Sequence, residues 1–342
     1  MTETSRRAIL SSLDPRRMEL ILYPTEQCNF RCTYCYEDFL LGKMSRETID
    51  GIKRLISHRA PDIKHLNMSW FGGEPLAAKD VVYEIAEHAH QECQAKGVHL
   101  TGHLTTNGYF VDVETAARLH SLGQSHYQIS LDGLGEDHDK TRKLMSGGGT
   151  FARIWSNMLA LRDSDVGFHI NFRIHLTREN LASIERLAHE MRREFLHDSR
   201  FTAYTKTIEN LGNDAANDLL IPLHERQASY RRIADAFGIA MNDQTADTEA
   251  APTSPQICYA ARPNSLAIRA NGVIQKCTVL MSDDTNRIGA IKPDGSMDLD
   301  RDKMGYWMRG YDSMDLNELK CPAHSSRAES RKTIPIVPVS AS

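Results

Sequence analysis

The chain has 342 residues, of which 41% are hydrophobic and 25% charged, and it carries a formal net charge of -4 at pH 7. These proportions are typical of globular domains and exclude a disordered or fibrous chain, and the two signs of charge are too mixed for a nucleic-acid-binding surface. The sequence has neither the ~20 apolar residues of a membrane span nor the apolar core of a signal peptide, so we expect a cytoplasmic protein with no membrane or nucleic-acid partner.

Strand-like and helix-like stretches alternate over the first two-thirds of the sequence. The predicted strands cover residues 18–23, 66–71, 127–131, 168–176 and 201–205, with one more ending at residues 105–108. The predicted helices have apolar residues at helical spacing; one follows Ser45, and the others cover residues 82–97, 112–122, 150–161, 180–195 and 224–237. Six such units in series favour a parallel sheet, in either an open barrel or a doubly wound arrangement.

The predicted strand at residues 168–176 separates apolar from polar side chains. One face carries Phe168, Ile170, Phe172, Ile174 and Leu176, and the other carries His169, Asn171, Arg173 and His175. If the apolar face meets surrounding helices, the polar face lines the interior, and this favours a barrel that encloses a polar ligand.

The composition changes after the last predicted helix. Residues 241–257 are rich in Ala, Thr, Asp and Pro and form a predicted linker. Beyond the linker, Asn271–Gly272 and Pro293–Asp294–Gly295 are turn signals that predict two hairpins. The predicted domains are a barrel over residues 16–240, a small α+β module over 258–324 and a terminal tail over 325–342.

Three of the seven cysteines, Cys28, Cys32 and Cys35, fall within eight residues after the first predicted strand. Thiols stay reduced in the cytoplasm, so clustered cysteines there more often bind metal than form disulfides. Three thiolates can hold three irons of a four-iron cluster and leave the fourth iron open to a small molecule. Zinc binding and a coincidental spacing are the alternatives. Cys93, on an apolar helix stripe, is predicted to be a buried core residue.

The spacing Cys28-x3-Cys32-x2-Cys35, with Tyr34 before the last cysteine, resembles the signature of the radical S-adenosylmethionine (SAM) superfamily. The wider run from Pro24 to Glu37 resembles the branch with SPASM-type C-terminal domains, many of whose members modify peptides or proteins. The resemblance implies a partial (β/α)6 TIM-like barrel, a 4Fe-4S cluster and SAM. It also implies an enzyme that passes one electron to SAM and forms a 5'-deoxyadenosyl radical, with a flavodoxin- or ferredoxin-type reductant.

Further segments at successive strand ends resemble the SAM contacts of the family. Gly72–Gly73–Glu74–Pro75 is similar to the segment that contacts the SAM amino group, and Arg173 is placed to pair with the SAM carboxylate. An ordinary turn and a structural salt bridge are the respective alternatives. The implied cofactor-binding residues are Tyr34, Gly72, Gly73, Glu74, Thr106, Asn107, Ser130, Asp132 and Arg173. His138, Asp139 and Arg142 resemble an H-D-x-x-R element of this branch, for which we favour a structural or substrate-positioning role.

In the C-terminal module, Cys258, Cys277 and Cys321 resemble the start of a SPASM or shorter twitch domain, which binds auxiliary iron–sulfur clusters. A full SPASM domain has seven cysteines, and here Asn264 lies near where another would fall. The resemblance therefore implies one auxiliary cluster rather than two, with His324 or substrate as the fourth ligand. The alternative is a degenerate module with inert thiols.

We predict from these resemblances an enzyme that abstracts hydrogen from a residue of a ribosomal precursor peptide, with cross-linking, oxidation or epimerisation as the outcome. Sulfatase maturation is disfavoured, because Thr278 stands where those relatives carry a carboxylate. The first 17 residues are too short for a leader-binding domain, so leader recognition would need a separate protein or the barrel. The alternatives are a radical SAM dehydrogenase of a small molecule such as an amino sugar, and a non-catalytic iron–sulfur or zinc protein.

Overall fold

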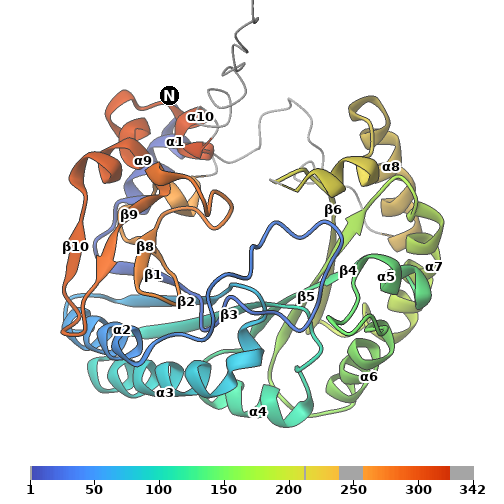
Figure 1. Ribbon diagram of the computed structural model, residues 1–342, viewed down its shortest axis with the longest axis horizontal. Coiled ribbons are helices and arrows are strands. Elements are labelled where there is room, and N and C mark those ends of the chain that lie inside the picture. The colour runs from blue at the N-terminus through green and yellow to red at the C-terminus, as the bar shows by residue number, and fades with distance from the viewer. Residues whose placement is uncertain (1, 212, 239–256, 324–342) are drawn as a thin grey trace, which may run out of the picture.

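The computed structural model describes residues 2–211, 213–238 and 257–323. Their strands form one ten-stranded sheet in the order β10-β9-β8-β7-β1-β2-β3-β4-β5-β6. The sheet curves around an open centre, and helices cover its outer side (Figure 1). The architecture is therefore a partial TIM-like barrel of the predicted α/β class.

Six neighbouring parallel strands form the barrel. They are β1 (Arg17–Leu22), β2 (His65–Trp70), β3 (His99–Thr106), β4 (His126–Leu131), β5 (His169–Leu176) and β6 (Phe201–Thr207). The connecting helices are α2 (Arg46–Arg59), α3 (Lys79–Lys96), α4 (Val113–Ser121), α5 (Glu136–Thr141), α6 (Phe151–Arg162), α7 (Leu181–Glu194) and α8 (Leu223–Phe237). The predicted strands and helices agree with these except for α5 and small shifts at their ends.

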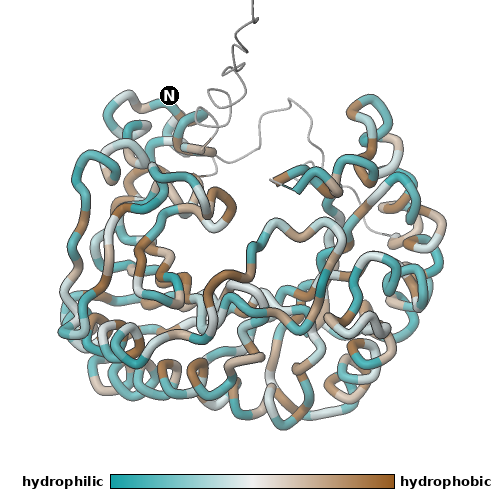
Figure 2. Tube along the Cα trace, viewed as in Figure 1, coloured by the Kyte–Doolittle hydropathy of each residue, from teal (hydrophilic) through white to brown (hydrophobic). Residues whose placement is uncertain are grey.

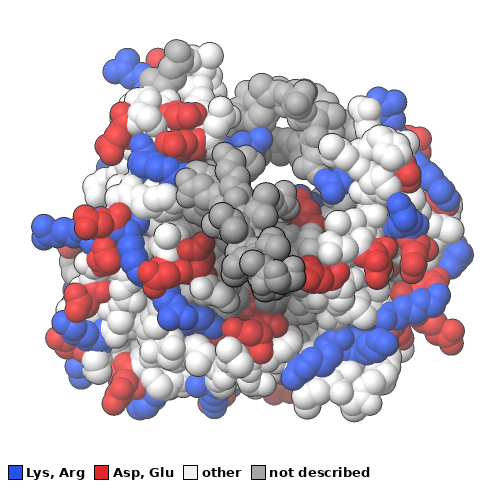
Figure 3. All heavy atoms as spheres, turned by 45° about the horizontal axis from the view of Figure 1, so that its top comes forward, with Lys and Arg blue, Asp and Glu red and all other residues white. Residues whose placement is uncertain are grey.

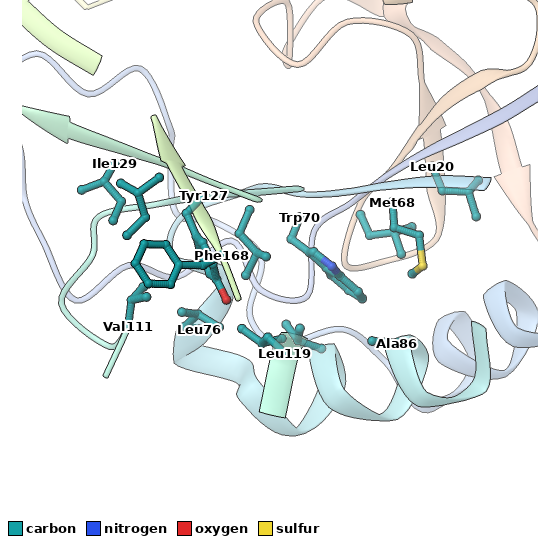
Figure 4. Close-up of a cluster of buried hydrophobic side chains, with 14 of the residues drawn as sticks. Leu20, Met68, Trp70, Leu76, Ala86, Val111, Leu119, Tyr127, Ile129 and Phe168 are labelled. Atoms are coloured by element: carbon teal, nitrogen blue, oxygen red, sulfur yellow. The ribbon is translucent and has the colours of Figure 1, made fainter. Parts of the chain in front are cut away.

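The main core lies between the sheet and its helices, as Figure 4 shows for one part of it. Leu20, Met68 and Trp70 point from the strands towards α3 and are fully buried. Trp70 also donates a hydrogen bond from Nε1 to Gln124 Oε1 at 2.8 Å, so its one polar atom has a partner inside the core. This apolar layer leaves the opposite face of the sheet free to be polar.

The inner face of the sheet is polar, as the alternation along β5 predicted. Ile170 and Phe172 on the outer face are fully buried, whereas His169, Asn171 and Arg173 on the inner face are only partly buried. Hydrophobic and hydrophilic residues alternate along the tube of the strands in Figure 2. Polar side chains of β5 therefore line the inside of the barrel.

The C-terminal module extends the barrel sheet. Strand β7 (Ser265–Ile268) pairs in parallel with β1, and β8 (Val273–Gln275), β9 (Arg287–Ile291) and β10 (Met297–Leu299) continue the sheet in antiparallel order. Gly272 and Gly295 have φ of 83° and 82° in the two predicted hairpin turns. The helices α9 (Arg301–Ser313) and α10 (Leu316–Lys320) complete the module. The domain boundaries remain predictions, and residues 241–256 and 324–342 lie outside the described residues.

Several helices have no counterpart in the sequence prediction. Helix α1 (Glu3–Ser12) begins at an N-cap where Thr2 accepts from the Ser5 amide, and its Ile9 packs against Ile257, Ala261 and Leu319. Four short 3-10 helices are η1 (Pro75–Ala78), η2 (Asp214–Leu219), η3 (Tyr259–Ala261) and η4 (Asp284–Asn286). Within the described part of the chain, no helix has the length and apolarity needed to cross a membrane. Lys and Arg alternate with Asp and Glu over the face in Figure 3.

A buried ion pair joins the loop after β1 to the C-terminal module. The Glu26 side chain is 0% exposed and that of Arg269 8% exposed. Arg269 Nε donates to Glu26 Oε1 at 3.0 Å, Arg269 Nη2 donates to Oε2, and the Ala270 amide reaches Oε1 at 3.4 Å. Such bidentate pairing compensates for the removal of both charges from water.

We expect Arg269→Met to lower the free energy of unfolding by about 3–5 kcal/mol, because it leaves the Glu26 carboxylate buried without its cation. Denaturant unfolding of the iron-free protein under anaerobic conditions measures the loss. The double variant Glu26→Gln with Arg269→Met is the matched control and should recover a large part of it. Equal losses in both variants would show that the ion pair is not the cause.

Candidate functional site

The three cysteines after β1 face one cavity of about 300 Å³. Their loop is held by hydrogen bonds from the Arg31 amide to Lys143 O at 2.8 Å and from the Thr33 amide to Thr141 O at 3.0 Å. The cavity lies at the carboxyl ends of the barrel strands, and its wall includes Cys28, Cys32, Cys35, Gly72, Gly73, Thr106, Asn107, Ser130 and Arg173. These are sequence-predicted site residues, brought together from β1, β2, β3, β4 and β5. Cavities at this end of barrel strands commonly hold active sites.

The surroundings of these cysteines disfavour a free thiolate and are compatible with thiolates bound to iron. Burial, together with nearby Glu74, raises the pKa of Cys28 to about 12, and burial raises the pKa of Cys35 to about 11. Cationic iron offsets the cost of a buried thiolate, so these groups fit a cluster that displaces their protons. No three ligand groups among the described residues converge on a single ion.

Two glycines let the end of β2 approach the cysteine loop closely. A Cβ atom on Gly72, whose φ is 102°, would lie 2.5 Å from Thr25 O, and one on Gly73 would lie 2.4 Å from Gln27 O. Any side chain at either position would push the loop away from the strand end. The glycines therefore fix the position of the cysteines, and their contact with SAM remains a prediction.

Glu74 ties the ends of β2 and β3 together. Its carboxylate is 0% exposed and accepts hydrogen bonds from the Leu76 amide at 3.0 Å, Thr106 Oγ1 at 2.8 Å and the Asn107 amide at 2.7 Å. Asn107 in turn donates from Nδ2 to Asn29 Oδ1 at 2.8 Å in the cysteine loop. These contacts give Glu74, Thr106 and Asn107 a structural function, and the predicted contact of Glu74 with the SAM ammonium remains a prediction.

Tyr34 anchors the other side of the cysteine loop. Its hydroxyl donates to Asp132 Oδ2 at 2.7 Å and accepts from Arg142 Nη1 at 2.9 Å, and His175 Nδ1 lies 3.1 Å from Asp132 Oδ1. Burial opposes the charged form of Asp132, but the hydrogen bond with His175 and the charge of Arg142 hold its pKa below the usual value. The resemblance implies that Tyr34 and Asp132 contact SAM, which remains a prediction. It does not predict that the two side chains contact each other.

The H-D-x-x-R element supports this network. His138 Nδ1 accepts from the Asp132 amide at 3.2 Å, and Asp139 Oδ1 accepts from the Thr150 and Phe151 amides at 2.7 and 2.9 Å, at the start of α6. Arg142 is buried and bonds to Tyr34. These contacts are structural, and the substrate-positioning alternative for the three residues remains a prediction.

The C-terminal cysteines form a second group. Cys277 and Cys321 both act electrostatically on Cys258, and burial raises the pKa of Cys258 to about 11. The Cys277 amide donates to Asn286 Oδ1 at 2.8 Å, and the Cys258 amide donates to Leu319 O at 2.9 Å. All seven cysteines are described and none forms a disulfide. Cys93 is 2% exposed in the barrel core, as predicted, and His324 lies outside the described residues.

The module also reaches the first cavity. Thr278 and Val279, directly after Cys277, belong to its wall. Thr278 is held by Tyr259, whose hydroxyl accepts from the Thr278 amide at 2.9 Å and lies 2.8 Å from Thr278 Oγ1. The cavity wall therefore includes residues of both the barrel and the C-terminal module.

We expect acid to destabilise the protein partly through His138. Burial lowers the pKa of His138 to about 4, whereas an unfolded histidine has a pKa near 6.5. Below pH 6.5 the unfolded chain gains a proton that the folded chain does not, so this residue costs about 2 kcal/mol of stability between pH 7 and pH 5. Unfolding free energies of the iron-free protein at both values measure the effect.

His138→Asn is the comparison, because its Oδ1 can accept from the Asp132 amide but does not titrate. Its free energy of unfolding should fall by about 2 kcal/mol less over the same interval. An identical fall in the parent protein and the variant would contradict the assignment.

Comparison with known proteins places this site in a family. Residues 22–191 match the model described as the Radical SAM superfamily. The Fe-coproporphyrin III synthase of Methanosarcina barkeri is 27% identical over 212 residues, which are 60% of this chain and 48% of that protein. The chain thus spans about half the length of this curated relative.

Solved structures share the fold at lower sequence identity. Native anSMEcpe with bound AdoMet has a TM-score of 0.62 at 16% identity, over 84% of this chain and 80% of that chain. Streptococcus suis SuiB bound to the precursor peptide SuiA has a TM-score of 0.56 at 14% identity, over 87% and 69% of the two chains. The similarity covers both the barrel and the C-terminal module.

Proposed function

Because this chain belongs to the radical SAM superfamily, we propose that it abstracts a hydrogen atom from a residue of a ribosomally made precursor peptide. The cofactors of the family are a 4Fe-4S cluster and SAM. When bound, they supply a one-electron reductive cleavage of SAM and a 5'-deoxyadenosyl radical that takes hydrogen from a substrate carbon. Cross-linking, oxidation or epimerisation of the peptide would follow.

One observation carries the proposal: three partly buried thiols face a single cavity whose wall is formed by residues at the ends of the barrel strands and by the C-terminal module. Cys28, Cys32 and Cys35 would hold three irons of the cluster. Gly72, Gly73, Ser130 and Arg173 would bind SAM beside them, with Arg173 pairing with its carboxylate. Because Arg173 Nε is buried and has no hydrogen-bond partner among the described residues, it is suited to such an anion.

The peptide substrate is supported by the shared fold with SuiB, which was solved with its precursor peptide. The cavity wall combines barrel residues with Thr278 and Val279, so a bound peptide residue would be enclosed from both sides and kept from water. We further propose that Cys258, Cys277 and Cys321 hold one auxiliary iron–sulfur cluster, with His324 or substrate as its fourth ligand. A flavodoxin- or ferredoxin-type protein would supply the electron.

Iron content tests the assignment of both cysteine groups. After anaerobic reconstitution with iron and sulfide, we expect about eight irons per chain, and about four in the triple variant Cys28→Ala, Cys32→Ala, Cys35→Ala. The variant Cys258→Ala, Cys277→Ala, Cys321→Ala should also keep about four. Cys93→Ala, a buried cysteine outside both groups, should keep all eight. About four irons in the parent and none in the first variant would remove the auxiliary cluster, and zinc in place of iron would overturn the proposal.

Cleavage of SAM tests catalysis separately from metal binding. We expect the reduced, reconstituted protein to form 5'-deoxyadenosine, measured by liquid chromatography and mass spectrometry, and the Cys28, Cys32, Cys35 triple variant to form none. The three thiols would hold the cluster that binds SAM, so their removal would also remove the group that reduces SAM. A fully loaded protein that leaves SAM intact would be a non-catalytic iron–sulfur protein.

A further inference from the structure

The side chain of Glu37, in the cavity wall, is a second one without a hydrogen-bond partner among the described residues. Both carboxyl oxygens of Glu37 are buried, and neither has a hydrogen-bond partner among the described residues. Glu37 lines the same cavity as Cys28, Cys32 and Cys35. A buried carboxyl group without hydrogen bonds is costly in a folded protein, so this one requires an explanation.

Aromatic side chains share the cavity wall with Glu37, among them Tyr36 and Phe71. Tyr23 and Tyr36 both lie within electrostatic range of Glu37. These two tyrosines pack in one cluster with Phe71 and Tyr259, and the rings of Tyr23 and Phe71 meet edge to face at 5.6 Å. The Tyr23 hydroxyl is also buried and has no partner in the described part of the chain. Aromatic faces beside a carboxylate are the usual surroundings of a bound organic cation.

Arg269 and Lys206 form their hydrogen bonds with carboxylates other than Glu37. Arg269 acts on Glu37 from a distance but forms its hydrogen bonds with Glu26. Lys206, which lines the same cavity, donates to Glu209 Oε1 at 2.7 Å. The other charges acting on Glu37, from Glu26 and Asp38, are negative. Among the described residues, no cation donates a hydrogen bond to this carboxyl group.

We propose that Glu37, together with Tyr36 and Phe71 of the same cavity wall, binds a cationic group of the substrate. The ligand chemistry is an alkylammonium or guanidinium group, which would donate hydrogen bonds to the two free carboxyl oxygens. The proposal rests on the proposed function, because it places this group beside the SAM site. A lysine or arginine side chain of a precursor peptide carries it, and so does an amino sugar.

The position of the site is consistent with substrate selection. Tyr36 and Phe71 belong to the cavity wall together with Glu37, whereas Tyr259 holds Thr278 at the side of the C-terminal module. A cation held by Glu37 would therefore lie in the cavity that Cys28, Cys32 and Cys35 also line. A substrate without the cation would leave the carboxyl group unpaired, so a neutral analogue should bind much more weakly.

Binding of small probes to the reconstituted protein with SAM tests the proposal. The cationic probes are N-acetyl-L-lysine N-methylamide, its arginine counterpart and glucosamine. N-acetyl-L-norleucine N-methylamide is the neutral control, because it is the lysine probe without its ammonium group. Isothermal titration calorimetry measures each dissociation constant in the parent protein, in Glu37→Gln and in Glu209→Gln. Glu209 is the matched control, since it is a carboxylate of the same cavity wall that already has a partner.

We expect at least one cationic probe to bind the parent protein, Glu37→Gln to weaken it by about tenfold or more, and the norleucine probe not to bind. Glu209→Gln should change the dissociation constant by less than about threefold, because its carboxylate already pairs with Lys206. Binding of the lysine or arginine probe identifies a peptide as the source of the cation, and binding of glucosamine alone identifies an amino sugar.

Three results would overturn the assignment: no cationic probe binds, Glu37→Gln binds as tightly as the parent protein, or Glu37→Gln weakens SAM instead of the probe. The last result would make Glu37 part of the SAM site. Thermal unfolding separates misfolding from loss of binding, since Glu37→Gln replaces a carboxyl group that has no hydrogen-bond partner among the described residues and should not lower the melting temperature. Iron content and 5'-deoxyadenosine formation are read in the same samples, so a failure of the proposed function is distinguishable from a failure of this inference.

Discussion

The cysteine loop has almost no regular structure, and buried carboxylates hold it against the strands. Glu26 binds Arg269 and the Ala270 amide after β7, Glu74 binds Thr106 and the Asn107 amide at the end of β3, and Asp132 at the end of β4 binds Tyr34. All three carboxylates are at most 1% exposed. The loss of any hydrogen bond to one of these carboxylates would therefore cost free energy, and these hydrogen bonds fix the position of the loop.

Because of these contacts, a movement of the cysteine loop away from the strands costs free energy. Removing one donor from a buried carboxylate leaves a charge without compensation, whereas a loop held by water-exposed contacts would move at little cost. Glycines at 72 and 73 bring the backbones within contact distance, and the carboxylates then fix them there. A cluster bound to this loop would keep a constant position relative to the strand ends, as transfer of a hydrogen atom to a radical carbon demands. Glu37 differs from these carboxylates because neither of its oxygens has a hydrogen-bond partner among the described residues.

The sequence predicted the barrel well because its signals are local. The alternation of β5 and the apolar stripes of the helices depend only on neighbouring residues, and so does the cysteine spacing. The sequence did not predict α1, whose Ile9 is buried against residues from the far end of the chain. It also did not predict the Tyr34–Asp132 contact or the unpaired state of Glu37. Both depend on which side chains meet across strands, and a local sequence pattern does not predict such contacts.

The parallel pairing of β1 with β7 has a consequence for how the chain folds. In the register of that pair, Glu19 lies opposite Ser265, so the first barrel strand has its second neighbour only after most of the chain has been synthesised. Until then β1 is an exposed edge that can pair with another chain, and Glu26 lacks Arg269. Contacts between strands so far apart in the sequence slow folding. We therefore expect the barrel to finish folding only after the whole polypeptide has been synthesised. Assembly of the site is therefore a late event, completed by the same module that contributes Thr278 and Val279 to its wall.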